Sequence, residues 1–429
     1  MFGFANFLLL ALFATVVFDL IFALARGGGL RGALHGLWNT PHLLFGQQLA
    51  EWRLQLGRIL FAAGLAAYEI SVVFCNSMAR QNWAWVQGVM SPVLEWLAFL
   101  CFGAKILFGT RYTWRELLAG GALYFIARWV YFNSQNIWWI GIVVAVLAAK
   151  DVPLRRPLQV YFASGCAAMA VVLALHFAGI VAPDLTSERM GALRGTYGYG
   201  HPNTFGGLVF GLVLAYALLR AQKVRWVDCL LVFAVGVFLL VGPASRSAAL
   251  CTLALAIGLV FCRLRAGHSV PRWWPGTCAG MVGLTAAVSY LLPLLVIKVG
   301  PWNNDIGPAW LAKLDSLLTC RISLTWMAYR LLDVKIAGQV FDWPTVDNSF
   351  AFALFQFGPV VAALLGILFA AALLGHAKQG RRVEVCCLFA MLAYAYMEVQ
   401  PFHLTTNPTA LLLCGAVFAQ TSARWQKIE

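Results

Sequence analysis

The feature that most restricts the fold of this chain is a succession of long apolar stretches that runs through almost its whole length. A helix needs about 20 apolar residues to cross a bilayer, and most of the stretches approach that length. They predict a polytopic, all-α bundle of about 12–13 transmembrane helices, forming one domain over residues 1–429. The predicted spans are 3–25, 59–79, 84–108, 116–132, 137–149, 158–181, 203–219, 226–242, 247–262, 276–297, 358–375, 384–400 and 406–423.

The composition excludes a soluble protein. Hydrophobic residues make up 61% of the chain and charged residues only 11%, whereas a soluble domain carries about 25% charged residues. The net charge of +14 does not indicate a nucleic-acid partner, because the basic residues lie in short runs between apolar stretches. The first 25 residues lack the basic start and the cleavage site of a signal peptide, so they are interpreted as a retained helix.

The basic residues also orient the chain, since cytoplasmic loops carry an excess of Lys and Arg. One set of alternating loops, which ends with Arg424 and Lys427, holds 20 of the 31 basic residues, and the opposite set holds ten. The first set is therefore predicted to be cytoplasmic. The loops 181–202 and 299–357 are predicted to be extracytoplasmic, the second being a large loop with short helices. Chemistry is expected at that outer face, because the inner loops are too short for a soluble domain.

The cysteine and acidic patterns predict neither a metal nor a cofactor. Most of the eleven cysteines lie inside apolar runs, where they are interpreted as small buried hydrophobic residues, while Cys320 lies in the long loop. The sequence contains no CxxC or CxxH spacing and no Asp-x-Asp pair. Positive charge for an anionic substrate must therefore come from side chains.

The predicted outer segment 194–207 combines an arginine, a glycine-rich turn and the start of a span. Arg194 is followed by three closely spaced glycines, which permit a ligand to approach the backbone. His201, Pro202 and Asn203 then open the next helix, and a helix N-terminus that points outward attracts anions. The alternative is an ordinary interfacial loop with a solvated arginine.

Two more arginines lie on the predicted outer side, against the positive-inside bias. Arg246 begins a span whose next 15 residues are uncharged. Arg321 falls on the apolar stripe of a helix expected near 311–335, where a buried arginine needs an anionic partner. The alternative for Arg246 is a side chain that reaches the lipid head groups.

Two carboxylates accompany the arginines. Asp347, followed by Asn348, precedes the span that starts near Phe357 and Gly358, and a carboxylate at the rim of an outer cavity can act as a general base. The alternative is a helix N-cap. Glu398 lies near the outer end of its own span and needs a partner there, for which an arginine is expected.

These motifs occur in the same order in the bacterial polysaccharide polymerase and O-antigen ligase superfamily, which the chain resembles over roughly residues 90–415. The matching residues are Arg194, His201-Pro202-Asn203, Ser245-Arg246, Arg321, Asp347-Asn348, Phe357-Gly358, Glu398 and Asn407-Pro408. The layout is most similar to the polymerases of capsule, exopolysaccharide and O-antigen. Ligases carry His-Asn at the position of Asp347-Asn348, so this departure favours a polymerase.

The resemblance implies a metal-independent glycosyltransferase with a GT-C-like fold in the bacterial plasma membrane, with its active site on the extracytoplasmic face. Such an enzyme transfers a growing glycan from undecaprenyl diphosphate to the next lipid-linked repeat unit. The implied partners are these lipid-linked glycans, membrane lipids, a chain-length regulator and a flippase, with no nucleic acid.

Roles for the site residues follow from the same resemblance. Arg194, Arg246 and Arg321 are expected to bind the donor diphosphate, because a guanidinium matches phosphate geometry, and His201 and Asn203 are expected to shape that site. Asp347 is the first candidate for activating the acceptor hydroxyl and Glu398 the second, with Asn348 in support.

Two rival functions remain open from the sequence. An O-antigen ligase shares the donor and differs in its acceptor, the lipid A core. A flippase or another transporter of lipid-linked glycans predicts polar residues that line both halves of the membrane and basic residues at mid-depth, whereas the buried charges of this chain gather toward the predicted outer face.

Overall fold

The computed structural model describes residues 29–181, 187–189, 192–296 and 307–418, together with single positions between 14 and 24. The predicted first span, 3–25, lies largely outside the described residues, and so does the end of the last span. Residues 299–306 of the predicted long loop also fall outside them.

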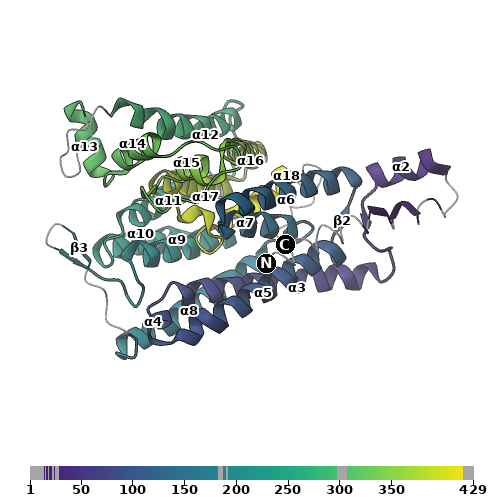
Figure 1. The fold of residues 1–429 in the computed structure, drawn as a ribbon, viewed down its shortest axis with the longest axis horizontal. Coiled ribbons are helices and arrows are strands. Elements are labelled where there is room, and N and C mark those ends of the chain that lie inside the picture. Colours follow the sequence, from purple (N-terminus) through teal and green to yellow (C-terminus); the bar gives the residue numbers. More distant parts are fainter. Residues whose placement is uncertain are drawn as a thin grey trace.

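The described chain is a helical bundle with two small two-stranded sheets (Figure 1). Strand β1 (His42–Leu43) pairs antiparallel with β2 (Arg111–Tyr112), and β3 (Ser187–Arg189) pairs antiparallel with β4 (Ala192–Arg194). The helices of the first half are α2 (Gly29–Asn39), α3 (Ala50–Cys75), α4 (Ala79–Asn82), η1 (Val86–Met90), α5 (Ser91–Phe108), α6 (Trp114–Ser134), α7 (Ile137–Ala148) and α8 (Arg155–Phe177).

The second half continues the bundle and includes the short helices of the predicted long loop. Its helices are α9 (Pro202–Leu219), α10 (Trp226–Val241), α11 (Arg246–Leu264), α12 (Trp274–Leu291), η2 (Leu292–Leu295), α13 (Ala309–Leu317), α14 (Arg321–Leu331), α15 (Ser349–Phe352), η3 (Ala353–Phe357), α16 (Pro359–Lys378), α17 (Arg382–Met397), η4 (Gln400–Phe402), η5 (Pro408–Leu413) and α18 (Cys414–Val417). Helical structure therefore occurs at each predicted span from 59–79 to 406–423.

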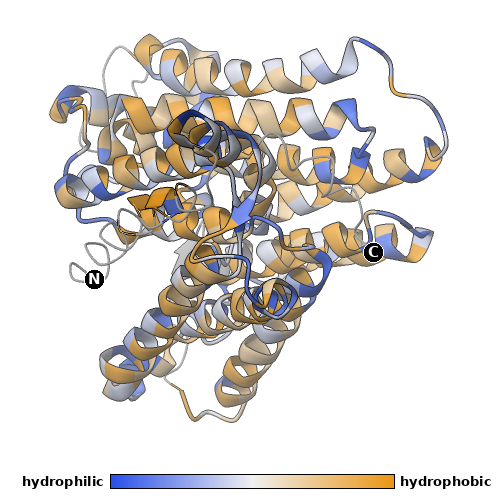
Figure 2. Ribbon diagram, turned by 90° about the vertical axis from the view of Figure 1, so that its right-hand side faces the viewer, coloured by the Kyte–Doolittle hydropathy of each residue, from blue (hydrophilic) through white to orange (hydrophobic). Residues whose placement is uncertain are grey.

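Within the described residues, seven helical segments are long and apolar enough to cross a bilayer. They are α3, η1 with α5, α8, α9, α11, α12 with η2, and α16. Three shorter apolar segments, α7, α10 and η5 with α18, lie among them. Apolar residues cover the helices, while hydrophilic residues concentrate at helix ends and loops (Figure 2). The chain is thus a multi-pass membrane protein.

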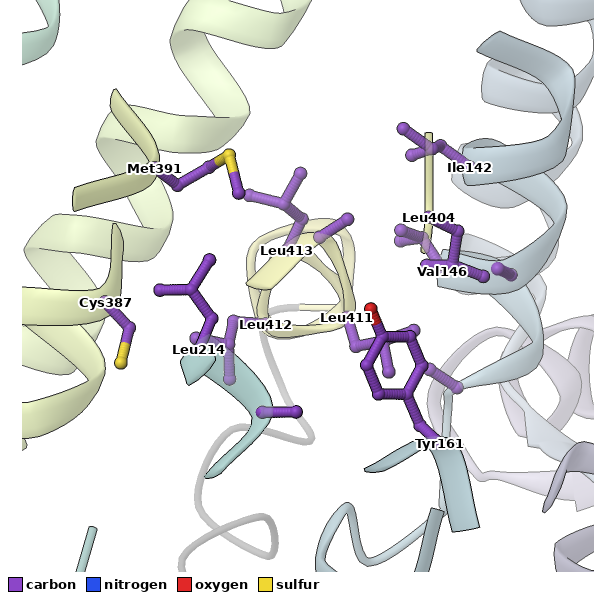
Figure 3. Packing of buried hydrophobic residues seen from close by; sticks show 14 of the residues in the cluster. Ile142, Val146, Tyr161, Leu214, Cys387, Met391, Leu404, Leu411, Leu412 and Leu413 are labelled. Carbon is purple, nitrogen blue, oxygen red and sulfur yellow. The ribbon is translucent and has the colours of Figure 1, made fainter. Parts of the chain in front are cut away.

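The centre of the bundle is built around short helices that are buried on all sides. The side chains of α7 are buried from Trp139 to Ala148, so this helix is an internal element of the bundle. Helix η5 places Leu411, Leu412 and Leu413 between α7, α9 and α17 (Figure 3). Because lipid is as apolar as these side chains, close packing rather than transfer from water stabilises this core.

The predicted continuous helix near 311–335 is wrong. The chain forms α13 and α14 instead, with a break at which Thr319 and Cys320 adopt positive φ values of 61° and 63°. Asp315 causes the break: its backbone oxygen accepts from the amide of Cys320 at 2.8 Å, and its buried carboxylate accepts from the amide of Ile322 at 2.7 Å. The carboxylate thus caps the first turn of α14 and competes with continuation of α13. Arg321 is nevertheless buried, as its apolar neighbours predict.

Candidate functional site

Six segments that are distant in sequence meet at one end of the bundle. Helices α9, α11 and α14 begin there, α17 ends there, and the hairpin strand β4 and the residues before α15 lie against them. Every residue assigned to the site from the sequence lies in one of these segments. The three helix N-termini bring the positive ends of their dipoles to this region.

Glu398, directly after α17, is the centre of the contacts. Its Oε1 atom accepts hydrogen bonds from Arg321 Nη2 at 2.6 Å, from Ser247 Oγ at 2.8 Å and from Asn203 Nδ2 at 3.1 Å. Only 4% of the residue is exposed. A carboxylate this deeply buried needs charged and hydrogen-bonding partners, and here they come from α14, α11 and α9. Glu398 therefore ties these three helix starts together.

Asn203 connects Glu398 to the buried side chain of Arg194. The Oδ1 atom of Asn203 accepts from Arg194 Nη2 at 2.9 Å while its Nδ2 atom donates to Glu398. Arg194 also donates to the backbone oxygens of Ala244 at 3.2 Å and Pro243 at 3.4 Å, in the turn before α11. The guanidinium of Arg194 thus fixes β4, α9 and this turn relative to one another.

The guanidinium of Arg321 is also largely engaged by the protein. Its Nε atom donates to the backbone oxygen of Met397 and its Nη1 atom to that of Leu318, the second at 2.9 Å. Its Nη2 atom binds Glu398 and lies 3.9 Å from Oδ2 of Asp347. Arg321 is therefore placed to orient both carboxylates, the expected anionic partner being Glu398.

The two carboxylates differ in accessibility. The side chain of Asp347 is 31% exposed, whereas that of Glu398 is 6% exposed. Among the described residues, the only ion pair of the Asp347 carboxylate is the 3.9 Å approach of Arg321, and no hydrogen bond to this carboxylate occurs there. Asp347 can therefore meet a substrate hydroxyl directly, while Glu398 is committed to internal contacts.

Asn348 has a structural role in this arrangement. Its Oδ1 atom accepts from the amides of Phe350 and Ala351 at 2.9 and 3.1 Å, which makes it the N-cap of α15, and its Nδ2 atom donates to Ser289 Oγ. The N-cap alternative considered for the Asp347-Asn348 pair thus applies to Asn348. The cap holds the preceding Asp347 in place.

His201 and Arg246 are the two basic residues of the set that remain open to solvent. His201 is the N-cap of α9, and its Nδ1 atom accepts from the amide of Asn203 at 3.1 Å. Partial desolvation by the surrounding protein and then Arg194 lower the pKa of His201, and Asp347 opposes them. The ring is therefore neutral at pH 7, which leaves Nε2 as a donor. Arg246 begins α11 and makes no hydrogen bond or ion pair with the described residues.

Three contributors received no role from the sequence: Ser247, Asp315 and Ser245, the last of which was noted only as part of the Ser245-Arg246 motif. Ser247 binds Glu398, Asp315 fixes the start of α14, and Ser245 Oγ lies 3.5 Å from Asn203 Oδ1. The hydroxyls on both sides of Arg246 were a visible signal, since a serine at a helix start inside an apolar region needs a polar partner. Asp315 could have been identified in the same way, because it is a carboxylate on an otherwise apolar helix face and also needs a polar partner.

An apolar cavity of about 80 Å³ adjoins the network on the side of α12, α16 and α17. Its lining includes Tyr290, Phe350, Phe402 and Ser349, and Ser349 Oγ donates to the backbone oxygen of Glu398. The cavity therefore touches the same segment that carries the buried carboxylate.

Comparisons with protein-family models, with curated proteins and with solved structures give no match to this chain. An accessible carboxylate, a neutral histidine and the helix starts of α9 and α11 lie around one buried carboxylate, and Arg246 is the first residue of α11, next to Ser247, which binds that carboxylate. This set can bind an anion and remove a proton from a hydroxyl beside it.

Proposed function

We propose that this protein is a glycosyltransferase that polymerises undecaprenyl-diphosphate-linked repeat units into a polysaccharide at the outer face of the plasma membrane. The observation that carries the proposal is the pairing of exposed Asp347 with a buried network centred on Glu398, at the end of the bundle where α9 and α11 begin. The Lys and Arg distribution supports the assignment of this end to the outer face.

Arg246 is the residue best placed to bind the donor diphosphate directly. Its guanidinium is exposed and without a partner among the described residues, whereas those of Arg194 and Arg321 are held by internal acceptors. We therefore assign Arg246 and His201 to the diphosphate. Arg194 and Arg321, which the sequence assigned to the same task, become positioning residues for Asn203 and Glu398.

Asp347 accepts the proton of the acceptor hydroxyl in this mechanism. The acceptor oxygen then forms a bond to the anomeric carbon of the donor, and the bond from that carbon to the diphosphate oxygen breaks. Undecaprenyl diphosphate leaves with the electron pair, its negative charge stabilised by Arg246, the Nε2–H group of His201 and the helix N-termini. The proton passes from Asp347 to solvent.

The lipid carrier fits the surroundings of the site. Residues of α12 and α16 line the apolar cavity beside Ser349, and most of the surface of these two helices is not covered by other parts of the protein. Exposed apolar side chains such as Leu284 and Ile367 cover these surfaces. An isoprenoid chain held there would place its diphosphate next to the Glu398 network.

Deletion of the gene tests the proposal and separates it from its rivals. The expected result is loss of polymer with accumulation of single lipid-linked repeats that are accessible from the outer face. Accumulation of complete lipid-linked polymer would identify a ligase. Accumulation of single repeats confined to the inner leaflet would identify a flippase, and unchanged polymer and lipid-linked pools would refute all three.

A further inference from the structure

A second cavity, of about 410 Å³, lies at the opposite end of the bundle from the Glu398 network. Its walls are the loop between α9 and α10, the last turn of α11 with the residues that follow, and the start of α17. Four basic side chains line it, namely Lys223, Arg263, Arg381 and Arg382, and we call it the basic cleft. The buried Glu384 is the one acidic residue in the lining.

Two of these cations are unengaged. Lys223 and Arg263 are exposed, and neither side chain makes a hydrogen bond or an ion pair with the described residues. Asp228, in the first turn of α10, is already paired with Arg220 at 3.1 Å. The lining of the cleft therefore has an excess of positive charge.

The remaining two arginines shape the cleft. Arg382 donates to the backbone oxygens of Arg265 at 2.7 Å and of His268, so it joins the start of α17 to the chain after α11. Arg381 is the residue that precedes α17, where the positive end of a 16-residue helix meets the cleft. These contacts hold the start of α17 against the residues after α11. The cleft is therefore a defined pocket between fixed segments of the chain.

The same three helices connect the basic cleft to the candidate site. Helices α9, α11 and α17 lie side by side, with the Glu398 network at one end and the cleft at the other (Figure 1). A helix of 19 residues such as α11 is about 28 Å long, which approaches the thickness of the hydrocarbon core. The cleft thus faces the opposite membrane surface, the one predicted to be cytoplasmic.

Apolar surface adjoins the cleft. Trp226 at the start of α10 and Phe261 and Leu264 at the end of α11 are 53%, 45% and 62% exposed. These side chains flank the basic lining in sequence, and at the ends of apolar helices they are expected to lie near the boundary between acyl chains and head groups. A ligand with a phosphate group and an apolar tail could contact the basic side chains with its phosphate and the exposed apolar side chains with its tail.

We propose that the basic cleft is a phosphate-binding site, which takes the head group of an anionic phospholipid or a soluble phosphate compound. Lys223 and Arg263 contact the phosphate oxygens, and the N-terminus of α17 with Arg381 contributes further positive potential. This inference is independent of the proposed glycosyltransferase function, because no residue of the Glu398 network takes part in it.

The test uses the full chain in neutral detergent and measures binding of short-chain phosphatidic acid and of inorganic pyrophosphate by native mass spectrometry. The double variant Lys223→Gln with Arg263→Gln is compared with Arg155→Gln with Arg156→Gln. The control removes two exposed cations from the start of α8, predicted to lie on the same membrane face outside the cleft. Since all four residues are exposed, folding is expected to persist. If the double variant does not fold, the single variant Lys223→Gln is used in its place.

We expect the cleft variant to weaken phosphatidic acid binding about 10-fold or more, and the control to change it little. Competition by pyrophosphate would show that the phosphate group alone suffices and that soluble ligands bind. Lipid binding without such competition would identify the head group of a membrane lipid as the ligand. The proposal is overturned if neither probe binds, if the cleft variant binds as the wild type does, or if the control weakens binding equally.

Discussion

Arg321 and Glu398, 77 residues apart in the chain, join the start of α14 to the end of α17 through a contact of 2.6 Å. The remaining donors of Arg321 bind backbone oxygens at Met397 and Leu318, so the arginine also holds the residue before the carboxylate and the turn before α14. The pair therefore organises the candidate site. It leaves Asp347, 3.9 Å from the same guanidinium, as the carboxylate that a substrate can reach.

Replacement of Asp347 by Asn is expected to lower the polymerisation rate about 10²–10⁴-fold, because a positioned general base contributes roughly this factor. Donor binding and thermal stability should stay near those of the wild type, since Arg246 and the Glu398 network are unchanged. Asp333→Asn, an exposed carboxylate on the same long loop, is the matched control. Wild-type turnover by Asp347→Asn in reconstituted vesicles would remove Asp347 from the mechanism.

Glu398→Gln should act mainly on stability. The amide keeps the shape of the side chain, but it leaves the buried guanidinium of Arg321 without its counter-charge. Breaking a buried ion pair costs about 3–5 kcal/mol, so thermal unfolding in detergent should shift to lower temperature while activity falls. A folded, donor-binding and inactive Glu398→Gln variant, beside an active Asp347→Asn variant, would reverse the roles of the two carboxylates.

Replacement by Lys is expected to affect Arg246 and Arg321 differently. Lys keeps the positive charge but lacks the planar guanidinium group with its several hydrogen-bond donors. Arg246→Lys should raise the apparent KM for the lipid-linked donor and leave the stability of this exposed position unchanged. Arg321→Lys should lower the unfolding temperature, because one ammonium cannot replace contacts to Met397, Leu318 and Glu398 together. Equal stability losses in both variants would contradict this division.

The proposed orientation of the bundle can be checked through Cys320, which is exposed at the break between α13 and α14. A membrane-impermeant maleimide added to intact cells, or to spheroplasts if an outer membrane is present, should label the wild type and not Cys320→Ser. Labelling of Cys320 only after permeabilisation of the plasma membrane would place the candidate site on the cytoplasmic side and refute the proposed mechanism.

The stability of the protein should depend on pH through His201, whose pKa in the folded chain lies below its ordinary value. Between these two pKa values the unfolded chain binds a proton that the folded chain does not. Stability should therefore fall as the pH drops below about 6.5, and become level below the folded pKa. His201→Asn, which can still cap α9, should lose less stability on acidification. An equal loss of stability on acidification in both proteins would exclude His201 as a source of the pH dependence.

The positions of the helices were largely predictable from the sequence, because every predicted span is apolar and most of them are long. The break between α13 and α14 was not, since the apolar stripe of residues 311–335 continues through it. The break depends on the carboxylate of Asp315, which binds amides of the following turn. A periodic pattern records which residues are apolar and does not reveal a local hydrogen bond that ends a helix.

The residues of the candidate site were found from the sequence more easily than their partners. An arginine or a carboxylate in an apolar stretch can be recognised from the sequence alone. That Asn203 contacts both Arg194 and Glu398 can be seen only in the three-dimensional structure. The assignment of Arg194 and Arg321 to the diphosphate considered their charge alone. The structure adds that their donors already bind acceptors of the protein.

The close approach of α9 to the start of α11 has a consequence for how the gene can change. A side chain at Gly206 would collide with the side chain of Ser245, so this position fixes the distance between the two helices. Asn203 lies three residues earlier, and one residue inserted between them would turn it by about 100° around the helix axis. Insertions and deletions of single residues should therefore be excluded from this turn of α9 during evolution, even where substitutions nearby are accepted.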